Sequence, residues 1–281
     1  MKLSIIIPTI GRETLLAVLD GIGACEEFEA IKPEILVVFD GKENEVIVKK
    51  IQNDKNIKIL ETGEKVFASG ARNLGIEKAT GDIIVFIGDD TVPKKDWLKK
   101  IYDFHIKFPE KERGLLGKIS WTKSLAKDSF HKFLETGPQF NFPQIKKHGA
   151  TWRHFYTSNI SVKKSLFGEV PMKFSTEFKG WGFEDIEFGY RLNKRGLVLS
   201  FDESCEVLHD HPQNFKDLIR QTIQARENAK IFEKLHPEIK ILPQGGKFVL
   251  LRFLIFLSWF FVPYSKKLFW WREWKKAWIG F

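Results

Sequence analysis

Short apolar runs alternate with helix-like stretches over the first hundred residues of the chain. Residues 3–7, 35–39, 57–60 and 83–87 read as strands that are buried on both faces. The stretches between them, 13–22, 43–53 and 68–79, have the spacing of helices. This alternation predicts an α/β fold with a right-handed, doubly wound, mostly parallel sheet, in which ligands bind at the carboxyl ends of the strands.

Further along the chain the alternation is less regular. Helical spacing recurs at 97–108, 185–195 and 215–235, strand-like runs at 115–120 and 197–201, and a mixed stretch at 123–143. Because the chain contains neither an internal repeat nor a low-complexity linker, we expect the body to fold as one unit.

Three predicted strand ends carry residues that suit a ligand site: Pro8 with Thr9, Asp40 with Gly41, and Gly88 with Asp89 and Asp90. Two adjacent carboxylates repel each other unless a positive charge lies beside them. A divalent cation that bridges to a diphosphate would supply this charge. A solvated turn is the structural alternative, because Asp is a common turn residue.

A second group of candidate residues lies between Trp181 and Arg191. Glu184 and Asp185 begin a predicted helix, where the dipole favours anions and is expected to lower the pKa of Asp185. Such acids are also ordinary helix caps, and Glu187 forms an ordinary i, i+4 pair with Arg191. Trp181 favours a functional site, because its ring offers a platform for a sugar beside a potential general base.

A third candidate is His209, which is followed by an acid and a second histidine. Histidine together with carboxylates suits a manganese-like ion. A histidine pair in a loop is more often solvated than bound to a metal. His209 is therefore a candidate metal ligand only if its segment returns to the edge of the sheet.

Composition excludes several classes of protein. Of the 281 residues, 43% are hydrophobic and 29% are charged, which excludes a disordered or collagen-like chain. Cys25 and Cys205 lie far apart, so we expect neither a zinc site nor a disulfide framework. The N-terminus has no signal-peptide pattern, from which we expect a body on the cytoplasmic side.

The net charge of +9 is concentrated near the C-terminus, where residues 247–281 hold seven basic residues and one acid. Residues 248–262 are apolar apart from Arg252 and Ser258, but a membrane span needs about 20 residues. Beyond Pro263, helical spacing predicts one stripe of Leu268, Trp271, Trp274, Trp278 and Phe281, with Trp270 beside it and Lys266, Lys267, Arg272, Lys275 and Lys276 around it.

Tryptophan flanked by Lys and Arg is typical of a monotopic helix on anionic lipid. The long apolar run argues against nucleic acid as the partner of this basic segment. The alternative is that residues 248–262 pack on the body and that the tryptophans face an oligomer partner.

Five motifs, taken in order, resemble those of family 2 glycosyltransferases. They are residues 4–9 (SIIIPT), 37–41 (VVFDG), 71–76 (ARNLGI) followed by 79–82 (ATGD), 88–90 (GDD) with Pro93, and 181–191, which resembles the Trp-Gly-x-Glu-Asp segment of galactosyltransferases. The resemblance spans residues 2–211 and implies the GT-A fold, a Rossmann-like sheet flanked by helices. It implies a nucleotide-sugar-binding half at 1–110 and an acceptor-binding half at 111–215, and the pattern of the tail predicts membrane-attaching helices at 216–281.

The resemblance also implies roles for individual residues. Pro8, Thr9, Asp40, Arg72 and Asp89 would bind the nucleotide sugar, Asp90 and His209 would hold Mn²⁺ or Mg²⁺, Trp181 and Glu184 would hold the acceptor, and Asp185 would deprotonate its hydroxyl. The sequence departs from the family at Gly88, where many members have an acid, at Asp40, where two acids are common, and at Lys42, where Ser or Asn is common.

Together these roles imply a metal-dependent hexosyltransferase that uses a nucleoside diphosphate sugar, with UDP favoured, and inverts the anomeric carbon. The expected acceptor is a membrane-proximal glycan or lipid-linked sugar, made at the cytoplasmic face in polysaccharide or envelope synthesis. The alternative is a non-catalytic, nucleotide-binding GT-A subunit docked on the membrane. Intact Asp90, Glu184, Asp185 and His209 favour the enzyme.

Overall fold

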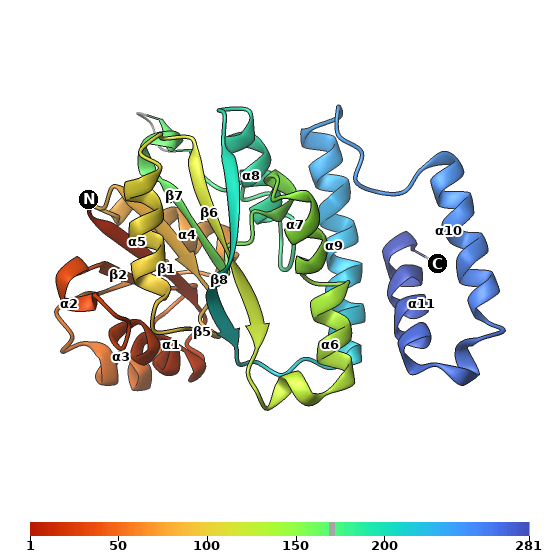
Figure 1. The fold of residues 1–281 in the computed structure, drawn as a ribbon, viewed down its shortest axis with the longest axis horizontal. Helices are drawn as coiled ribbons and strands as arrows, with labels where there is room; N and C mark the ends of the chain where they lie inside the picture. The colour runs from red at the N-terminus through yellow and green to blue at the C-terminus, as the bar shows by residue number, and fades with distance from the viewer. Residues whose placement is uncertain (169–171, 281) are drawn as a thin grey trace.

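A computed structural model describes residues 1–168 and 172–280 of the chain (Figure 1). Within those residues, eight strands form one sheet in the order β3-β2-β1-β4-β7-β6-β8-β5. The strands are β1 (Leu3–Thr9), β2 (Glu34–Phe39), β3 (Ile57–Glu61), β4 (Ile83–Ile87), β5 (Thr91–Pro93), β6 (Arg113–Trp121), β7 (Asn159–Lys163) and β8 (Val198–His209).

The four strands predicted from the first apolar runs are confirmed as β1 to β4. They pair in parallel, with β1 between β2 and β4, and with β3 beside β2. The helices of the body are α1 (Thr14–Gly23), α2 (Phe28–Ile31), α3 (Glu45–Ile51), α4 (Phe67–Lys78), α5 (Trp97–Lys107), α6 (Ser129–Thr136), α7 (Phe142–His148), α8 (Glu184–Asn193) and α9 (Phe215–Leu235), with 3-10 turns η1 (Leu125–Lys127), η2 (Trp152–His154) and η3 (Lys164–Phe167). These elements place two apolar clusters on opposite faces of the sheet.

Strands β5 and β7 were not predicted from the sequence. Both pair antiparallel with their neighbours, so the sheet is mixed. Strand β7 runs antiparallel to both β4 and β6, and β5 runs antiparallel to β8. Strand β7 alternates polar with apolar residues, yet all five are buried. Its Asn159 side chain accepts a hydrogen bond from Trp97 Nε1 and donates to the carbonyls of Lys118 and Cys205, each at 2.9 Å. Internal partners therefore allow a polar sequence to form a central strand.

Strand β8 is longer than predicted and ends at His209. Its last residues pair with β5, so that His209 lies opposite Thr91, and the Asp210 amide donates to the Asp90 carbonyl at 2.8 Å. The segment therefore returns to the sheet edge and brings His209 beside Asp90.

The C-terminal helices are α10 (Gly245–Ser258), the turn η4 (Val262–Tyr264) and α11 (Lys266–Ile279). Helix α11 lies between α9 and α10 (Figure 1). None of the helices within the described residues is both long enough and apolar enough to cross a membrane.

The arrangement contradicts two expectations for the tail: the alternative in which residues 248–262 pack on the body, and the exposure of the tryptophan stripe. Helix α10 does not pack into the core, because only Ile255 and Ser258 are buried along it. The tryptophan stripe does not face outward, because α11 packs on α9, and Leu268, Trp270, Trp271, Trp274 and Trp278 are all half-buried. Phe281 lies outside the described residues.

Candidate active site

The ends of β1 and β4 meet, as the parallel topology requires. Thr9 Oγ1 donates to Asp89 Oδ2 at 2.7 Å and accepts from the Gly11 amide at 2.9 Å. Pro8 is half-buried beside them. At the end of β2, Asp40 Oδ1 accepts the Val66 amide at 2.7 Å, directly before α4. The predicted donor-side residues of these three strands therefore share one sheet edge.

A basic residue lies between the two adjacent carboxylates. Arg12 Nη1 is 3.1 Å from Asp89 Oδ1 and 3.1 Å from Asp90 Oδ2. Burial and the charge of Asp90 raise the pKa of Asp89, against the opposing effect of Arg12. The sequence analysis missed Arg12, although its place in the loop after β1 puts it at the ligand-binding edge.

His209 completes this cluster. His209 Nε2 is 3.6 Å from Asp90 Oδ2, and its Nδ1 is buried without a hydrogen-bond partner among the described residues. Burial lowers the pKa of His209, which favours the neutral imidazole that ligates metals.

These side chains fit a cation that is held partly by the protein and partly by substrate phosphates. They do not form a site in which the protein supplies every ligand. Among the described residues, no three His, Cys, Asp or Glu side chains form a ready metal site. Mg²⁺ is usually held by one or two carboxylates together with substrate phosphates, and Mn²⁺ also accepts imidazole. Asp90 and His209 match that donor set, and Arg12 now supplies the positive charge beside it.

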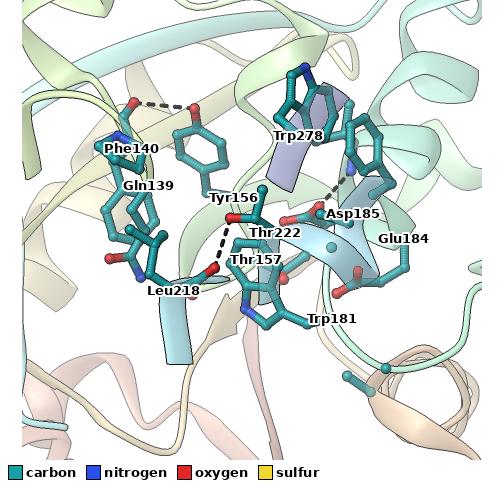
Figure 2. Close-up of a pocket in the computed structure, with 18 of the residues that line it drawn as sticks. Gln139, Phe140, Tyr156, Thr157, Trp181, Glu184, Asp185, Leu218, Thr222 and Trp278 are labelled. Carbon is teal, nitrogen blue, oxygen red and sulfur yellow. Dashed lines mark hydrogen bonds between the residues drawn. The ribbon is translucent and has the colours of Figure 1, made fainter. Parts of the chain in front are cut away.

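A cavity of about 540 Å³ lies beyond the sheet edge, and the predicted acceptor residues line it. Figure 2 shows Asp185 between the rings of Trp181 and Trp278 in this view. Its other walls were not predicted and come from distant segments: Gln139, Phe140, Tyr156, Thr157, Leu218, Thr222, Ala225, Trp274 and Lys275. Their separation along the chain leaves no local pattern for a sequence analysis to detect.

The loop before α8 has a strained backbone, and hydrogen bonds from a side chain on α9 hold it in place. Gly180, Gly182 and Phe183 all have positive φ, of 73°, 94° and 73°, and Phe183 pays a steric penalty there. Asn228 Nδ2 on α9 donates to the carbonyls of Lys179, Trp181 and Gly182 at 3.2, 3.2 and 2.8 Å. Such strain persists where surrounding contacts enforce it, as is common at functional sites.

We expect Asn228→Ala to lower the free energy of unfolding by about 1–3 kcal/mol, because three loop carbonyls lose a buried donor. Denaturant titration measures this loss, with the exposed Asn53→Ala as the control. Equal stability of the two variants would contradict the role given to Asn228.

Glu184 and Asp185 have different surroundings, although they are adjacent. Glu184 Oε1 is 3.1 Å from Arg72 Nη1, and both side chains are largely buried. Asp185 Oδ1 accepts its hydrogen bond from the Ile186 amide at 2.7 Å. Desolvation and the charge of Glu184 raise the pKa of Asp185 to about 7, so the lowered pKa expected from the helix dipole is wrong. The predicted pair of Glu187 with Arg191 is confirmed at 2.7 Å.

Sequence comparisons place the chain among known transferases. The model of glycosyl transferase family 2 matches residues 4–111. A chondroitin synthase from Escherichia coli is 27% identical over 242 residues, which cover 75% of this chain and 35% of that protein. The chain spans about a third of the length of the chondroitin synthases that it matches.

Solved structures share the fold. TarS 1-349 from S. aureus, in complex with UDP, has a TM-score of 0.58 and 20% identity, covering 82% of this chain and 65% of that one. The mannosyltransferase PcManGT from Pyrobaculum calidifontis, in complex with GDP-Man and Mn²⁺, has a TM-score of 0.64 and 15% identity, covering 99% and 84%. At such identities the likeness concerns the fold.

Proposed function

We propose that this chain transfers a hexose to a membrane-proximal glycan or lipid-linked acceptor, because residues 4–111 match the model of glycosyl transferase family 2 and the fold is that of the solved glycosyltransferases. The observation that carries this proposal is one cavity that holds Trp181, Glu184 and Asp185. UDP is the favoured donor nucleotide, as in the TarS complex. GDP is the alternative donor nucleotide, because the PcManGT complex contains GDP-Man.

In the proposed reaction, a bond forms between the acceptor oxygen and the anomeric carbon, while the bond from that carbon to the diphosphate breaks. The electron pair of the broken bond leaves with the diphosphate, and the acceptor proton goes to a carboxylate. Arg72 engages Glu184, so we assign the proton to Asp185 and acceptor orientation to Glu184 and Trp181. A single displacement needs only one such carboxylate, which implies inversion.

On the donor side, we assign Pro8, Thr9, Asp40, Arg72 and Asp89 to the nucleotide sugar, and Asp90 with His209 to Mn²⁺ or Mg²⁺. Such a cation neutralises the charge that develops on the leaving diphosphate. Arg12 lies between the two carboxylates and has to turn away to admit it.

The rate of transfer is expected to rise with pH, to reach half its maximum near pH 7 and to level off about one pH unit above that. A general base acts only when deprotonated, and the pKa of Asp185 is about 7, so the active fraction grows as the pH rises through that value. A pH series of initial rates under saturating donor measures this. A rate that is flat from pH 5 to pH 8 would argue against Asp185 as the base.

We propose that α10 attaches the protein to the cytoplasmic face of a membrane. Ten large apolar residues are exposed along α10 and the turn after it: Val249, Leu250, Phe253, Leu254, Phe256, Leu257, Trp259, Phe260, Phe261 and Tyr264. Lys247, Lys266 and Lys267 are exposed at the two ends of this surface. Apolar side chains bordered by Lys suit the boundary of an anionic bilayer, and the cytoplasmic leaflet carries that charge.

The double variant Phe256→Asp with Phe260→Asp is expected to bind anionic vesicles at least about a hundredfold more weakly, since burying each Phe contributes roughly 1.5–3 kcal/mol. Flotation with vesicles of phosphatidylglycerol and phosphatidylcholine measures binding. The control is Val46→Asp with Ile106→Asp, two equally exposed apolar residues on α3 and α5. Unchanged flotation of the α10 variant would overturn the membrane proposal.

The proposed function is tested by donor hydrolysis across a panel of UDP-, GDP- and other nucleotide sugars, with and without Mn²⁺. We expect one sugar to be released, faster with the metal. If every donor is left intact and unbound, the alternative of a non-catalytic, membrane-docked subunit replaces the enzyme.

A further inference from the structure

Helix α11 packs between α9 and α10 and also lines the cavity. Trp274, Lys275 and Trp278 of α11 line the same cavity as Asp185. Trp278 stacks on Phe183, the residue directly before Glu184, with ring centroids 6.1 Å apart and planes at 11°. Trp270 of the same helix packs on Phe130 with centroids at 5.1 Å. These contacts make α11 a fixed wall of the cavity.

Lys275 differs from Lys266 and Lys267 of α11, which are exposed, and from the two basic residues beside it. Arg272 and Lys276 both pair with Glu273, at 2.7 and 3.1 Å. Lys275 is half-buried, and no carboxylate pairs with it within residues 1–168 and 172–280. Its ammonium lies over the ring of Trp274, 3.9 Å from the centroid.

The charge of Lys275 is therefore incompletely compensated inside the cavity. A cation–π contact offsets part of the cost of removing an ammonium from water, and burial lowers the pKa of Lys275. The other cation of the lining, Arg72, is held by Glu184. An anionic group on the ligand would restore a full partner to Lys275.

We propose that α11 forms one wall of the acceptor site and that Lys275 binds an anionic group, a carboxylate or a phosphate, on the acceptor. This inference rests on the proposed function, because it assigns the cavity to the acceptor. The rings of Trp274 and Trp278 supply apolar faces for the sugar, and Lys275 selects a charged sugar or a phosphate-linked one over a neutral one.

Two matched pairs of probes test the proposal: methyl glucuronide against methyl glucoside, and glycerol phosphate against glycerol. Binding to the full chain with UDP and Mn²⁺ is followed by tryptophan fluorescence and by isothermal titration. We expect the anionic member of at least one pair to bind about tenfold more tightly, as for a hydrogen bond to a charged group. The pair that shows the preference distinguishes a carboxylate from a phosphate.

Lys275→Gln should abolish the preference and Lys275→Arg should keep it, whereas Lys276→Gln, on the same helix, should behave as wild type. No preference in either pair, or a preference that survives Lys275→Gln, overturns the proposal. Donor hydrolysis by the wild type is measured in the same samples. Hydrolysis without an anion preference refutes this inference alone, and a preference without hydrolysis refutes the proposed function alone.

Discussion

Asp185→Asn is expected to lower the rate of sugar transfer by about 10²- to 10⁴-fold, the usual contribution of a positioned general base. The amide has nearly the shape of the carboxylate but cannot accept the proton. Donor binding should persist, because Pro8, Thr9, Asp40 and Asp89 lie at the ends of β1, β2 and β4, and Arg72 on α4 pairs with Glu184 and not with Asp185.

The control for this variant is Glu177→Gln, which removes an exposed carboxylate from the segment before the strained loop. Initial rates and donor titrations on the three proteins separate loss of chemistry from loss of structure. If Asp185→Asn retains wild-type transfer, another group takes the proton and the assignment of the base is wrong.

Asp90→Asn is expected to weaken Mn²⁺ binding by about a hundredfold and to remove the metal dependence of donor binding, since a neutral amide oxygen attracts a divalent cation much less strongly than a carboxylate. Electron paramagnetic resonance of free Mn²⁺ measures the affinity without any turnover. The matched control is Asp103→Asn, an exposed acid on α5 that pairs with Lys99.

Equal Mn²⁺ affinity of Asp90→Asn and the wild type would contradict the assignment of Asp90 as a ligand. Chelation adds a second check. If donor binding is unchanged after dialysis against EDTA, the nucleotide is held by Thr9, Asp40, Arg72 and Asp89 without a cation.

Three strands of the parallel half, β1, β2 and β4, could be predicted because they are buried on both faces and therefore read as continuous apolar runs. Strand β3 was also predicted, but it lies at the edge of the sheet and the expected burial of its residues 57–60 is wrong, because each of them is partly or fully exposed. Strand β7 could not be predicted, because Asn159 depends on partners from β6, β8 and α5 that no local pattern reveals. The meeting of His209 with Asp90 was implied by the family resemblance and not by any local pattern, because it follows from the pairing of β8 with β5.

The pKa of Asp185 depends on two opposing effects, the helix dipole and burial beside a like charge. The position of the residue in the sequence reveals only the first, so the direction predicted from it is wrong. A helix N-terminus stabilises an anion by about 0.3–1 kcal/mol, whereas burial and a like charge can raise a pKa by up to 3–5 units. The position of Asp185 at the start of α8 was predicted correctly, but the cavity around it, contributed in part by α9 and α11, was not.

The packing of the second C-terminal helix, α11, on the body could not be predicted for a similar reason. Both segments are rich in aromatic residues, so hydropathy does not indicate which one packs on the body. Phe130 and Phe215 provide the surface, and Trp270 and Phe269 of α11 pack on them. Helix α10 is thereby left with its apolar side chains exposed.

The central claim is that Asp185 and its cavity perform sugar transfer, and a product assay tests it most directly. The donor identified by hydrolysis is supplied with a radiolabelled sugar, together with Mn²⁺ and an envelope extract from the cells that make the protein. The account predicts that the label enters a glycan or lipid-linked product with wild-type protein and not with Asp185→Asn. Label that stays in the donor or in free sugar with both proteins would contradict it.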